Sequence, residues 1–261
     1  MKYYLTIFSM FRNEKIYLKE WIDFHLNIGF EHIYLYDNLS TDNPLEILEE
    51  YISKNKVTYI KWDINYPKFT AREHFFKNYN NETYWCAFLD IDEFLFCVDP
   101  NDKIIEKIKD YEKFPGLAIN WYCYGDSGEE HYKNKYVIER FIKRAEKEYH
   151  INFHTKQIAK VNNILACENP HYFIYKYKEY AVNENKGRIE GAFTDKVYGD
   201  IFRINHYHSK SKEEFFNIKH NKNEANRSIA SLDYYNSYNT DSNLIEDKIL
   251  HRYLEEIKNA N

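Results

Sequence analysis

Two aspartates separated by one residue are the clearest chemical feature of this chain. Asp90 and Asp92 follow the apolar segment Tyr84–Leu89, and Glu93 comes directly after them. The segment is short and rich in aromatic residues, which favours a buried β-strand over a helix. Since residues i and i+2 of an extended chain point to the same side, both carboxylates could meet just past the strand's end. Clustered carboxylate oxygens suit Mg²⁺ or Mn²⁺, so the motif predicts a site for a cation that carries phosphates.

The elements that would position this motif follow an alternating pattern. Apolar runs predict strands at residues 1–11, 32–36, 57–62 and 84–89. Helical spacing and capping patterns predict helices at residues 18–26, 44–52 and 70–79. A capping box formed by Thr70 and Glu73 would open the third helix. The alternation predicts an α/β fold with a mainly parallel, Rossmann-like sheet flanked by helices.

The second half of the chain is less regular and predicts a smaller mixed α+β part. A helix is expected at residues 104–111, and strands are expected at 117–123 and 202–207. Residues 124–135 form a polar loop, and residues 136–200 give no clear pattern. Ser211 and Glu214 form another capping box. Apolar residues from Leu244 to Ile257 predict an amphipathic C-terminal helix, which would pack on the body or touch a membrane surface.

Composition narrows the classes of partner and compartment. The formal net charge of 261 residues is −5, so no basic field would recruit nucleic acid. The four cysteines show no C-x-x-C spacing, which predicts a reduced, cytoplasmic protein. No apolar run reaches the ~20 residues that a membrane span needs. Seven glycines form neither a G-x-G-x-x-G motif nor a P-loop, so phosphates would be held by metal and side chains.

Four ordered sequence blocks resemble glycosyltransferase family 92, which is similar to family 2 transferases with the GT-A fold. The blocks are residues 11–14, 34–42, 88–94 and 205–215. The resemblance implies transfer of a sugar, with inversion, from a nucleotide-diphosphate sugar to a glycan acceptor, with UDP as the expected nucleotide. It also implies a GT-A-like domain at residues 1–225, with a nucleotide-binding half (1–95), an acceptor-binding half (96–225) and a helical extension (226–261).

The resemblance also implies roles for individual residues. Asp90, Asp92 and His206 would hold the metal, and one imidazole among carboxylates favours Mn²⁺ slightly over Mg²⁺. Residues expected to contact the nucleotide or its phosphates are Phe11, Asn13, Glu14, Asp37, Asn38, Asp42, Arg72, Asp90, Ile91 and Lys210. An inverting transfer also needs a base that takes the proton of the acceptor hydroxyl. Candidates for that base are Asp126, Glu129, Glu130 and Glu93.

Two other functions fit the same residues. A D-x-D phosphohydrolase would use Asp90 as the nucleophile and Asp92 as the acid, although that motif normally follows the first strand rather than the fourth. A glycan-binding protein on a transferase fold would use the tyrosine-rich surface, because tyrosine rings stack on sugars while their hydroxyls form hydrogen bonds. His208 is expected to face solvent, and Trp121 fits a core position and an acceptor-stacking position equally well.

Overall fold

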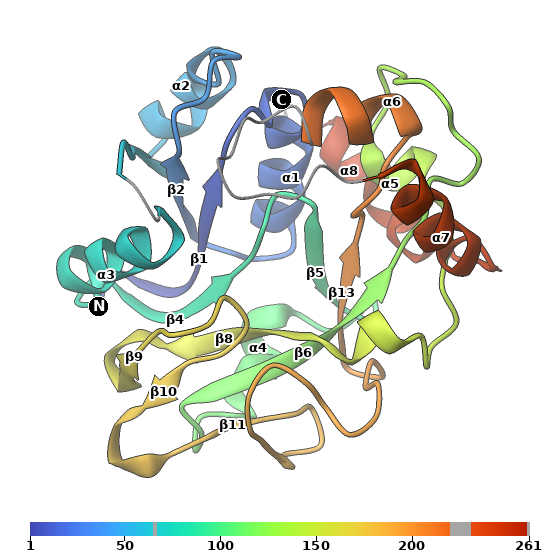
Figure 1. The fold of residues 1–261 in the computed structure, drawn as a ribbon. Helices are drawn as coiled ribbons and strands as arrows, with labels where there is room; N and C mark the ends of the chain where they lie inside the picture. The colour runs from blue at the N-terminus through green and yellow to red at the C-terminus, as the bar shows by residue number, and fades with distance from the viewer. Residues whose placement is uncertain (65–66, 220–230, 260–261) are drawn as a thin grey trace.

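The computed structural model describes residues 1–64, 67–219 and 231–259. These residues form a ten-stranded sheet with helices outside it (Figure 1). The main strand order is β12-β11-β6-β8-β4-β1-β2-β3, and β13 joins β6 to β5. The expected α/β class, with a parallel half and a smaller mixed half, is confirmed. The predicted boundary between residues 225 and 226 lies outside the described residues.

The first half of the chain contains the four predicted parallel strands. They are β1 (Tyr3–Phe11), β2 (His32–Asp37), β3 (Val57–Lys61) and β4 (Thr83–Phe88). They pair in the order β4-β1-β2-β3, all parallel. Every residue of β2 is buried, as expected for a central parallel strand with a helical layer on each face. The carboxyl ends of these strands therefore meet at one edge of the sheet.

Alternate residues of these strands pack into two separate cores. Ile7 and Leu35 lie in the core shared with α1 (Lys15–Asn27) and α2 (Leu45–Ser53). Phe8 and Tyr34 face the other way and contact Phe75 of α3 (Pro67–Tyr79). This division follows directly from the two-residue period of a strand.

The start of α3 differs from the prediction. The helix begins at Pro67, so the capping box predicted at Thr70 and Glu73 is wrong. The Thr70 hydroxyl instead accepts a hydrogen bond from the indole of Trp62 at 3.2 Å, three residues into the helix. A proline is well tolerated in the first turn, because its missing N–H would have no partner there.

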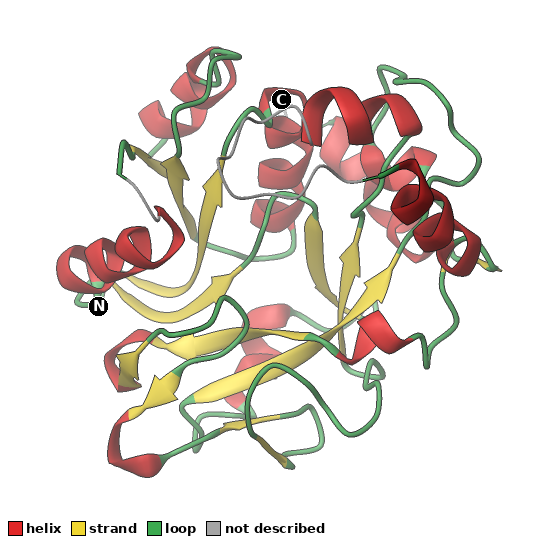
Figure 2. Ribbon diagram, in the orientation of Figure 1, coloured by secondary structure: helices red, strands yellow, loops and turns green. Residues whose placement is uncertain are grey.

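The second half of the sheet is mixed. The strand β8 (Thr155–Lys160) lies between β4 and β6 (Gly116–Cys123) and runs antiparallel to both. Next to β6, β13 (Phe202–His206) pairs in parallel with β6 and antiparallel with β5 (Glu93–Cys97). Figure 2 shows β5, β13 and the end of β6 side by side. The sequence predicts β6 and β13 but not β5 or β8.

Short elements complete the described chain. The helices are α4 (Ile104–Lys109), α5 (Val137–Arg140), α6 (Lys212–Glu214), α7 (Leu232–Ser242) and α8 (Leu254–Lys258). The short strands are β7 (Lys143–Arg144), β9 (Ile164–Ala166), β10 (Ile174–Tyr175), β11 (Ala181–Val182), β12 (Arg188–Ile189) and β14 (Ile245–Glu246). The capping box predicted at Ser211 and Glu214 is confirmed at the start of α6.

The continuous helix predicted from Leu244 to Ile257 is wrong. The chain instead forms β14, a 3₁₀ segment at Ile249–Tyr253 and the short α8. Asp247 separates these pieces, since its side chain accepts from the backbone N–H of Ile249 and binds Arg144 and Arg203. The apolar side chain of Ile257 is buried in the main core. Within the described ranges, no helix has the length and apolar character to cross a membrane.

Candidate active site

The D-x-D motif forms a tight turn between β4 and β5. The backbone N–H of Glu93 donates to the carbonyl of Asp90 at 3.1 Å, and the Glu93 carboxylate accepts from the N–H of Asp90 at 3.0 Å. The backbone at Asp90–Asp92 is therefore a turn, whereas the sequence analysis assumes an extended chain in which both carboxylates point to the same side. As a result, the carboxylates of Asp90 and Asp92 have different partners.

Asp92, His206 and His208 bring one ligand atom each within 4.8 Å of one another. The Asp92 carboxylate lies 3.6 Å from Nε2 of His206. Pairing of β13 with β5 causes this meeting, because His206 is in register with Glu93 and the N–H of Tyr207 donates to the Asp92 carbonyl. One carboxylate and two imidazoles are a suitable donor set for a divalent transition metal.

His208 is half-buried and has two aromatic contacts, whereas the sequence analysis expects it to face solvent. Its ring lies 5.1 Å from the ring of Tyr238, and its Nε2 is 3.1 Å from the hydroxyl of Tyr234. Both tyrosines belong to α7, which the sequence analysis does not predict. The helix therefore covers the outer side of the cluster and restrains the imidazole that lies two residues after His206.

Asp90 is held by a buried lysine. Nζ of Lys156 lies 2.7 Å from the Asp90 carboxylate and 3.3 Å from that of Glu93. Burial favours the neutral acid, but Lys156 and Lys68 outweigh this effect and hold the pKa of Asp90 below its usual value. Burial raises the pKa of Glu93 to about 8, although Lys156 opposes the shift. Asp90 is thus an ionised carboxylate beside the cluster. Glu93 stabilises the turn by accepting a hydrogen bond from the backbone N–H of Asp90.

The residues predicted to contact the nucleotide lie at the carboxyl ends of β1 and β2. Phe11 pairs with Asp37, and Phe8 pairs with Phe88 of β4, which places this edge level with the D-x-D turn. The side chain of Asn13 accepts from the N–H of Thr41 at 2.7 Å. This contact joins the two loops that begin at these strand ends.

Hydrogen bonds within these loops occupy several of the predicted side chains. Asp37 accepts from the N–H of Ser40 and the hydroxyl of Tyr59, and Asp42 accepts from the N–H of Lys15. The amide of Asn38 donates to the carbonyl of Trp62. Nucleotide contact by Asp37, Asp42 or Asn38 therefore stays a prediction, while their hydrogen bonds show how the loops are shaped. Glu14 is the residue that precedes the first turn of α1.

Arg72 and Lys210 lie on opposite sides of this edge of the sheet. The guanidinium of Arg72 is buried between the rings of Phe88 and Phe173 and donates to the carbonyls of Asn169 and Pro170. Nζ of Lys210 lies 4.3 Å from the centre of the Tyr17 ring, and its backbone has a φ of 53°. A phosphate contact by either residue stays a prediction.

A group of aromatic rings borders the cluster of Asp92, His206 and His208. Trp121 of β6 lies 4.3 Å from the ring of His206, 5.2 Å from that of His154 and 5.1 Å from that of His171. Nδ1 of His171 is 3.0 Å from the carbonyl of Thr155, and Nδ1 of His154 is 3.0 Å from that of Ile151. Because a carbonyl only accepts, Nδ1 must donate in both rings, which makes Nε2 the basic nitrogen.

The predicted bases in the 124–135 loop belong to a structural network. Asp126 accepts from the N–H of Gly128, the amide of Asn243 and the hydroxyl of Tyr235. Glu129 pairs with Lys133 at 2.7 Å, while Glu130 is exposed at 3.9 Å from Lys212. A base role for any of them stays a prediction.

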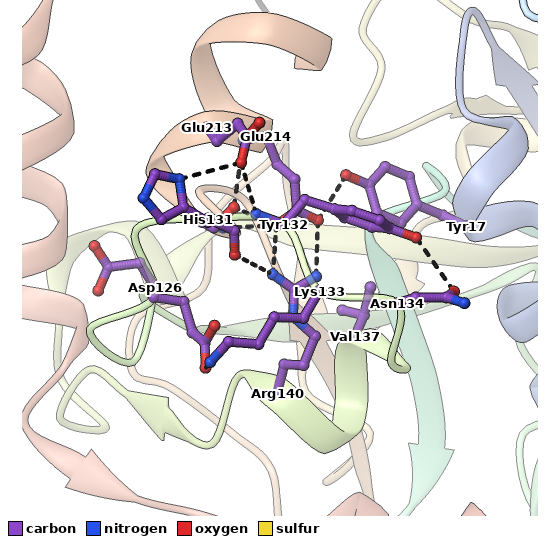
Figure 3. A network of polar contacts seen from close by, with 12 residues as sticks. Tyr17, Asp126, His131, Tyr132, Lys133, Asn134, Val137, Arg140, Glu213 and Glu214 are labelled. Carbon is purple, nitrogen blue, oxygen red and sulfur yellow. Dashed lines mark hydrogen bonds and ion pairs between the residues drawn. The ribbon is translucent and has the colours of Figure 1, made fainter.

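A buried ion pair fixes this loop to the rest of the molecule. Arg140 donates two hydrogen bonds to Glu214, which also accepts from the hydroxyl of Tyr17 (Figure 3). The Arg140 and Glu214 side chains are 2% and 1% exposed, so the pair is a true interior contact. It joins α1, α5 and α6, three elements that are distant in the sequence.

Sequence reasoning missed several residues at the site. The spacing of His206 and His208 was an available signal, since alternate residues after a strand can share one side. Lys156 had no assigned role in the sequence analysis, and its two acidic partners are 66 and 63 positions away, as the numbering shows. His154 carried no local pattern, and His171 was visible only as a histidine after a proline, without an assigned role. The fold brings both rings to Trp121.

Comparisons with solved structures give a distant likeness. The structure of S. aureus TarS in complex with UDP has a TM-score of 0.44 and 14% sequence identity, and the match covers 97% of this chain and 72% of that chain.

Comparisons of sequence are more specific. A glycosyltransferase family 92 protein of Oryza sativa subsp. japonica is 26% identical over 213 residues, which cover 76% of this chain and 35% of the rice protein. Another from Arabidopsis thaliana is 31% identical over 97 residues, which cover 37% of this chain and 17% of that protein. This chain thus spans about a third of the length of the rice relative. The family model of glycosyltransferase family 92 matches residues 2–246, and the chain therefore belongs to this family.

Proposed function

We propose that this protein is a metal-dependent, inverting glycosyltransferase that moves a sugar from a nucleotide-diphosphate sugar to a glycan acceptor. UDP-sugars are the first donors to test. The observation that carries the proposal is the meeting of Asp92, His206 and His208 at the sheet edge where the loops after β1 and β2 also lie. Family membership supports glycosyl transfer, and the cluster supports the need for a metal.

The donor atoms of this cluster fit a divalent ion. Asp92 and the two imidazoles would hold it. Asp90 stands two positions before Asp92 in the sequence. A bound ion would act as a Lewis acid that stabilises the charge growing on the diphosphate leaving group. Two imidazoles favour Mn²⁺ over Mg²⁺ more strongly than one would, because imidazole is a softer ligand than oxygen.

The chain itself would hold the donor and position its charge. The loops joined by Asn13 and Thr41 provide a shaped edge for the nucleotide. Lys156 keeps Asp90 ionised and in place, so that its carboxylate is available to the metal or to a ribose hydroxyl. Lys210, whose side chain lies over Tyr17, is the candidate cation for a phosphate oxygen.

His171 is a further candidate for the base, in addition to the carboxylates predicted from the sequence. Its basic Nε2 follows from the Nδ1 contact with the Thr155 carbonyl. Burial and the charge of Lys156 lower the pKa of His171 to about 4, so the ring is neutral at physiological pH.

Thermal shift and donor hydrolysis test the proposal together. We expect Mn²⁺ with one of UDP, GDP, CDP or ADP to raise Tm, and the matching nucleotide-sugar to be slowly hydrolysed. Asp92→Ala should abolish both effects. Asp241→Ala, on the exposed side of α7, is the matched control and should retain them.

Other outcomes would point elsewhere. Absence of any shift with all four nucleotides plus metal would contradict the proposal. Release of phosphate from a generic aryl phosphate, without hydrolysis of any nucleotide-sugar, would favour a phosphohydrolase. A cytoplasmic location is part of the proposal and is supported by the four cysteines, all of which are free thiols. Cell fractionation would test it and would reveal any peripheral membrane contact through the C-terminal elements.

A further inference from the structure

A cavity lies in the mixed half of the structure, among β9, β10, β11 and β12. Its volume is about 440 Å³, within the range of small-molecule sites. Four tyrosines line it: Tyr172, Tyr175, Tyr177 and Tyr180. In Figure 1 the strands β9, β10 and β11 lie together on the side of the molecule away from α2 and α6. The cavity is thus separate from the metal cluster and needs its own explanation.

The exposure of this aromatic surface is unusual. The side chain of Tyr177 is 89% exposed, and Leu165 and Tyr180 at the same cavity are 65% and 37% exposed. Burying rings of this size is normally favourable, so a ring kept in solvent is a candidate contact for a ligand. At the bottom of the cavity, the hydroxyl of Tyr175 donates to the side chain of Gln157, which fixes both groups.

The backbone beneath Tyr177 is strained. Tyr177 has a φ of 56° and Lys178 a φ of 58°, so two consecutive residues with side chains are in the left-handed region. Each such residue costs on the order of 1 kcal/mol, and neither is glycine. Glycine or asparagine would be the ordinary choice for this turn. Strain of this kind is concentrated at ligand sites, and here it directs an aromatic ring into solvent.

The charged side chains at the cavity are balanced. Lys178 and Arg188 oppose Glu179 and Glu190, and Arg188 pairs with Glu190 at 2.5 Å. The guanidinium of Arg188 also lies 4.6 Å from the centre of the Tyr180 ring. With no excess of positive charge, the cavity would not attract a nucleotide, a nucleic acid or an anionic lipid. Aromatic faces mixed with charged hydrogen-bonding groups suit a neutral ligand that is rich in hydroxyls.

Two segments of chain connect this cavity to the candidate active site. Tyr172 lines the cavity, and its neighbour His171 packs against Trp121. Gly191 also lines the cavity, and Phe193, two residues later, lies 4.3 Å from His154. Because a residue spans only ~3.3 Å of extended chain, the cavity and the aromatic group around Trp121 are neighbours.

We propose that this cavity binds sugar units of the acceptor glycan that are remote from the reacting hydroxyl. The proposal rests on the proposed function, since it places an acceptor at the site beside Trp121. It adds that the acceptor is a neutral oligosaccharide rather than a single sugar. Tyr177 and Tyr180 would stack on these units, and Arg188 with Glu190 would bond their hydroxyls.

Tyr177→Gly is the sharpest variant, because it removes the ring and relieves the left-handed backbone. Its stability should equal or exceed that of the wild type. The probe is an array of neutral linear oligosaccharides, from monosaccharides to hexasaccharides, applied to the whole protein without donor. The wild type should bind more tightly as length increases. Tyr177→Gly should weaken binding of the longest glycans about tenfold and leave monosaccharide binding unchanged.

The matched control is Tyr132→Ala, which removes another exposed tyrosine at a different cavity. It should keep the length dependence. The proposal is overturned if the wild type binds no neutral oligosaccharide, or if Tyr177→Gly keeps the same length dependence. Hydrolysis of the nucleotide-sugar is measured in parallel and should be equal in all three proteins. If the wild type hydrolyses no nucleotide-sugar, the proposed function is contradicted. The array result tests the cavity alone.

Discussion

Nζ of Lys156 lies 2.7 Å from the carboxylate of Asp90, although the two residues belong to different halves of the chain. The same amine lies 3.3 Å from Glu93, whose side chain is fully buried. Lys156 itself is 2% exposed. One buried cation therefore compensates two acids at the turn that carries the D-x-D motif.

Lys156→Met tests this arrangement. The variant keeps about the volume of the side chain but removes the cation that pairs with the ionised Asp90 carboxylate. Because the Asp90 side chain is 39% exposed, the loss should be smaller than for a fully buried pair, about 2 kcal/mol in the free energy of unfolding. Urea denaturation would measure the loss. Lys147→Met, which removes an exposed pair with Asp200, should cost less than about 1 kcal/mol, and a similar small loss in Lys156→Met would refute the interpretation.

Replacement of His171 tests the base. His171→Gln cannot take a proton, so we expect kcat for donor turnover to fall by about 10²-fold or more. Asp126→Asn should reduce kcat less than about tenfold, because its side chain serves the loop network and an amide can keep part of that bonding. Both variants should keep the Tm shift given by nucleotide and Mn²⁺. The reverse order of the two effects would assign the base to Asp126.

Metal preference should follow the donor set. His208→Asp replaces a softer nitrogen ligand by a hard oxygen ligand, so the ratio of Mg²⁺-supported to Mn²⁺-supported donor hydrolysis should rise. His150→Asp is the control, since His150 is exposed and outside the cluster. An unchanged metal ratio in His208→Asp would exclude His208 from the coordination sphere.

Glu20 should make stability depend on pH. Its buried carboxylate accepts from the N–H groups of Val137 and Ile138, while Lys210 and Arg140 provide the nearby positive charge. Burial outweighs these contacts and raises the pKa of Glu20 from its ordinary value of 4.5 to about 7. The folded state therefore binds more protons between these values, and Glu20 contributes less stability as the pH rises from about 4.5 to about 7.

Removal of this carboxyl should flatten that part of the pH profile. Glu20→Gln should lose a pH-dependent contribution on the order of 3 kcal/mol across the window. Denaturation midpoints at a series of pH values would give the slope for each protein. Glu49→Gln, on the exposed face of α2, should keep the slope of the wild type. Parallel profiles for Glu20→Gln and the wild type would rule out the shifted carboxyl.

The parallel half of the fold could be predicted because its signals are local. Runs such as His32–Asp37 are apolar and bounded by turn residues, and the helices between them show a clear apolar stripe. The strand β8 gave no such signal. Its sequence, Thr-Lys-Gln-Ile-Ala-Lys, is mostly polar, yet all six residues are buried. Lys156, Gln157 and Lys160 find distant partners in Asp90, Tyr175 and Glu112, which a local pattern cannot show.

Some residues of the candidate site could also be predicted from local sequence signals, and others could not. The position of Asp92 at the end of a strand and the order of the blocks that contain His206 could be read from the sequence. Whether the His208 side chain points to solvent or toward Asp92 and His206 could not be predicted, because it depends on contacts with Tyr234 and Tyr238 of α7. The roles of Asp126 and Arg72 depended on partners such as Tyr235 and the 167–170 segment. Tertiary contacts therefore decide which polar residues remain available for chemistry.

The placement of β13 has a consequence for synthesis on the ribosome. This strand comes late in the chain but fills the space between β5 and β6, and β5 pairs with no other strand of the described sheet. A nascent or prematurely terminated polypeptide that ends before residue 202 would expose two apolar strand edges, which favour aggregation. Translation must therefore pass His208 before Asp92, His206 and His208 can come together, so assembly of this cluster and protection of the sheet edges depend on the same late segment.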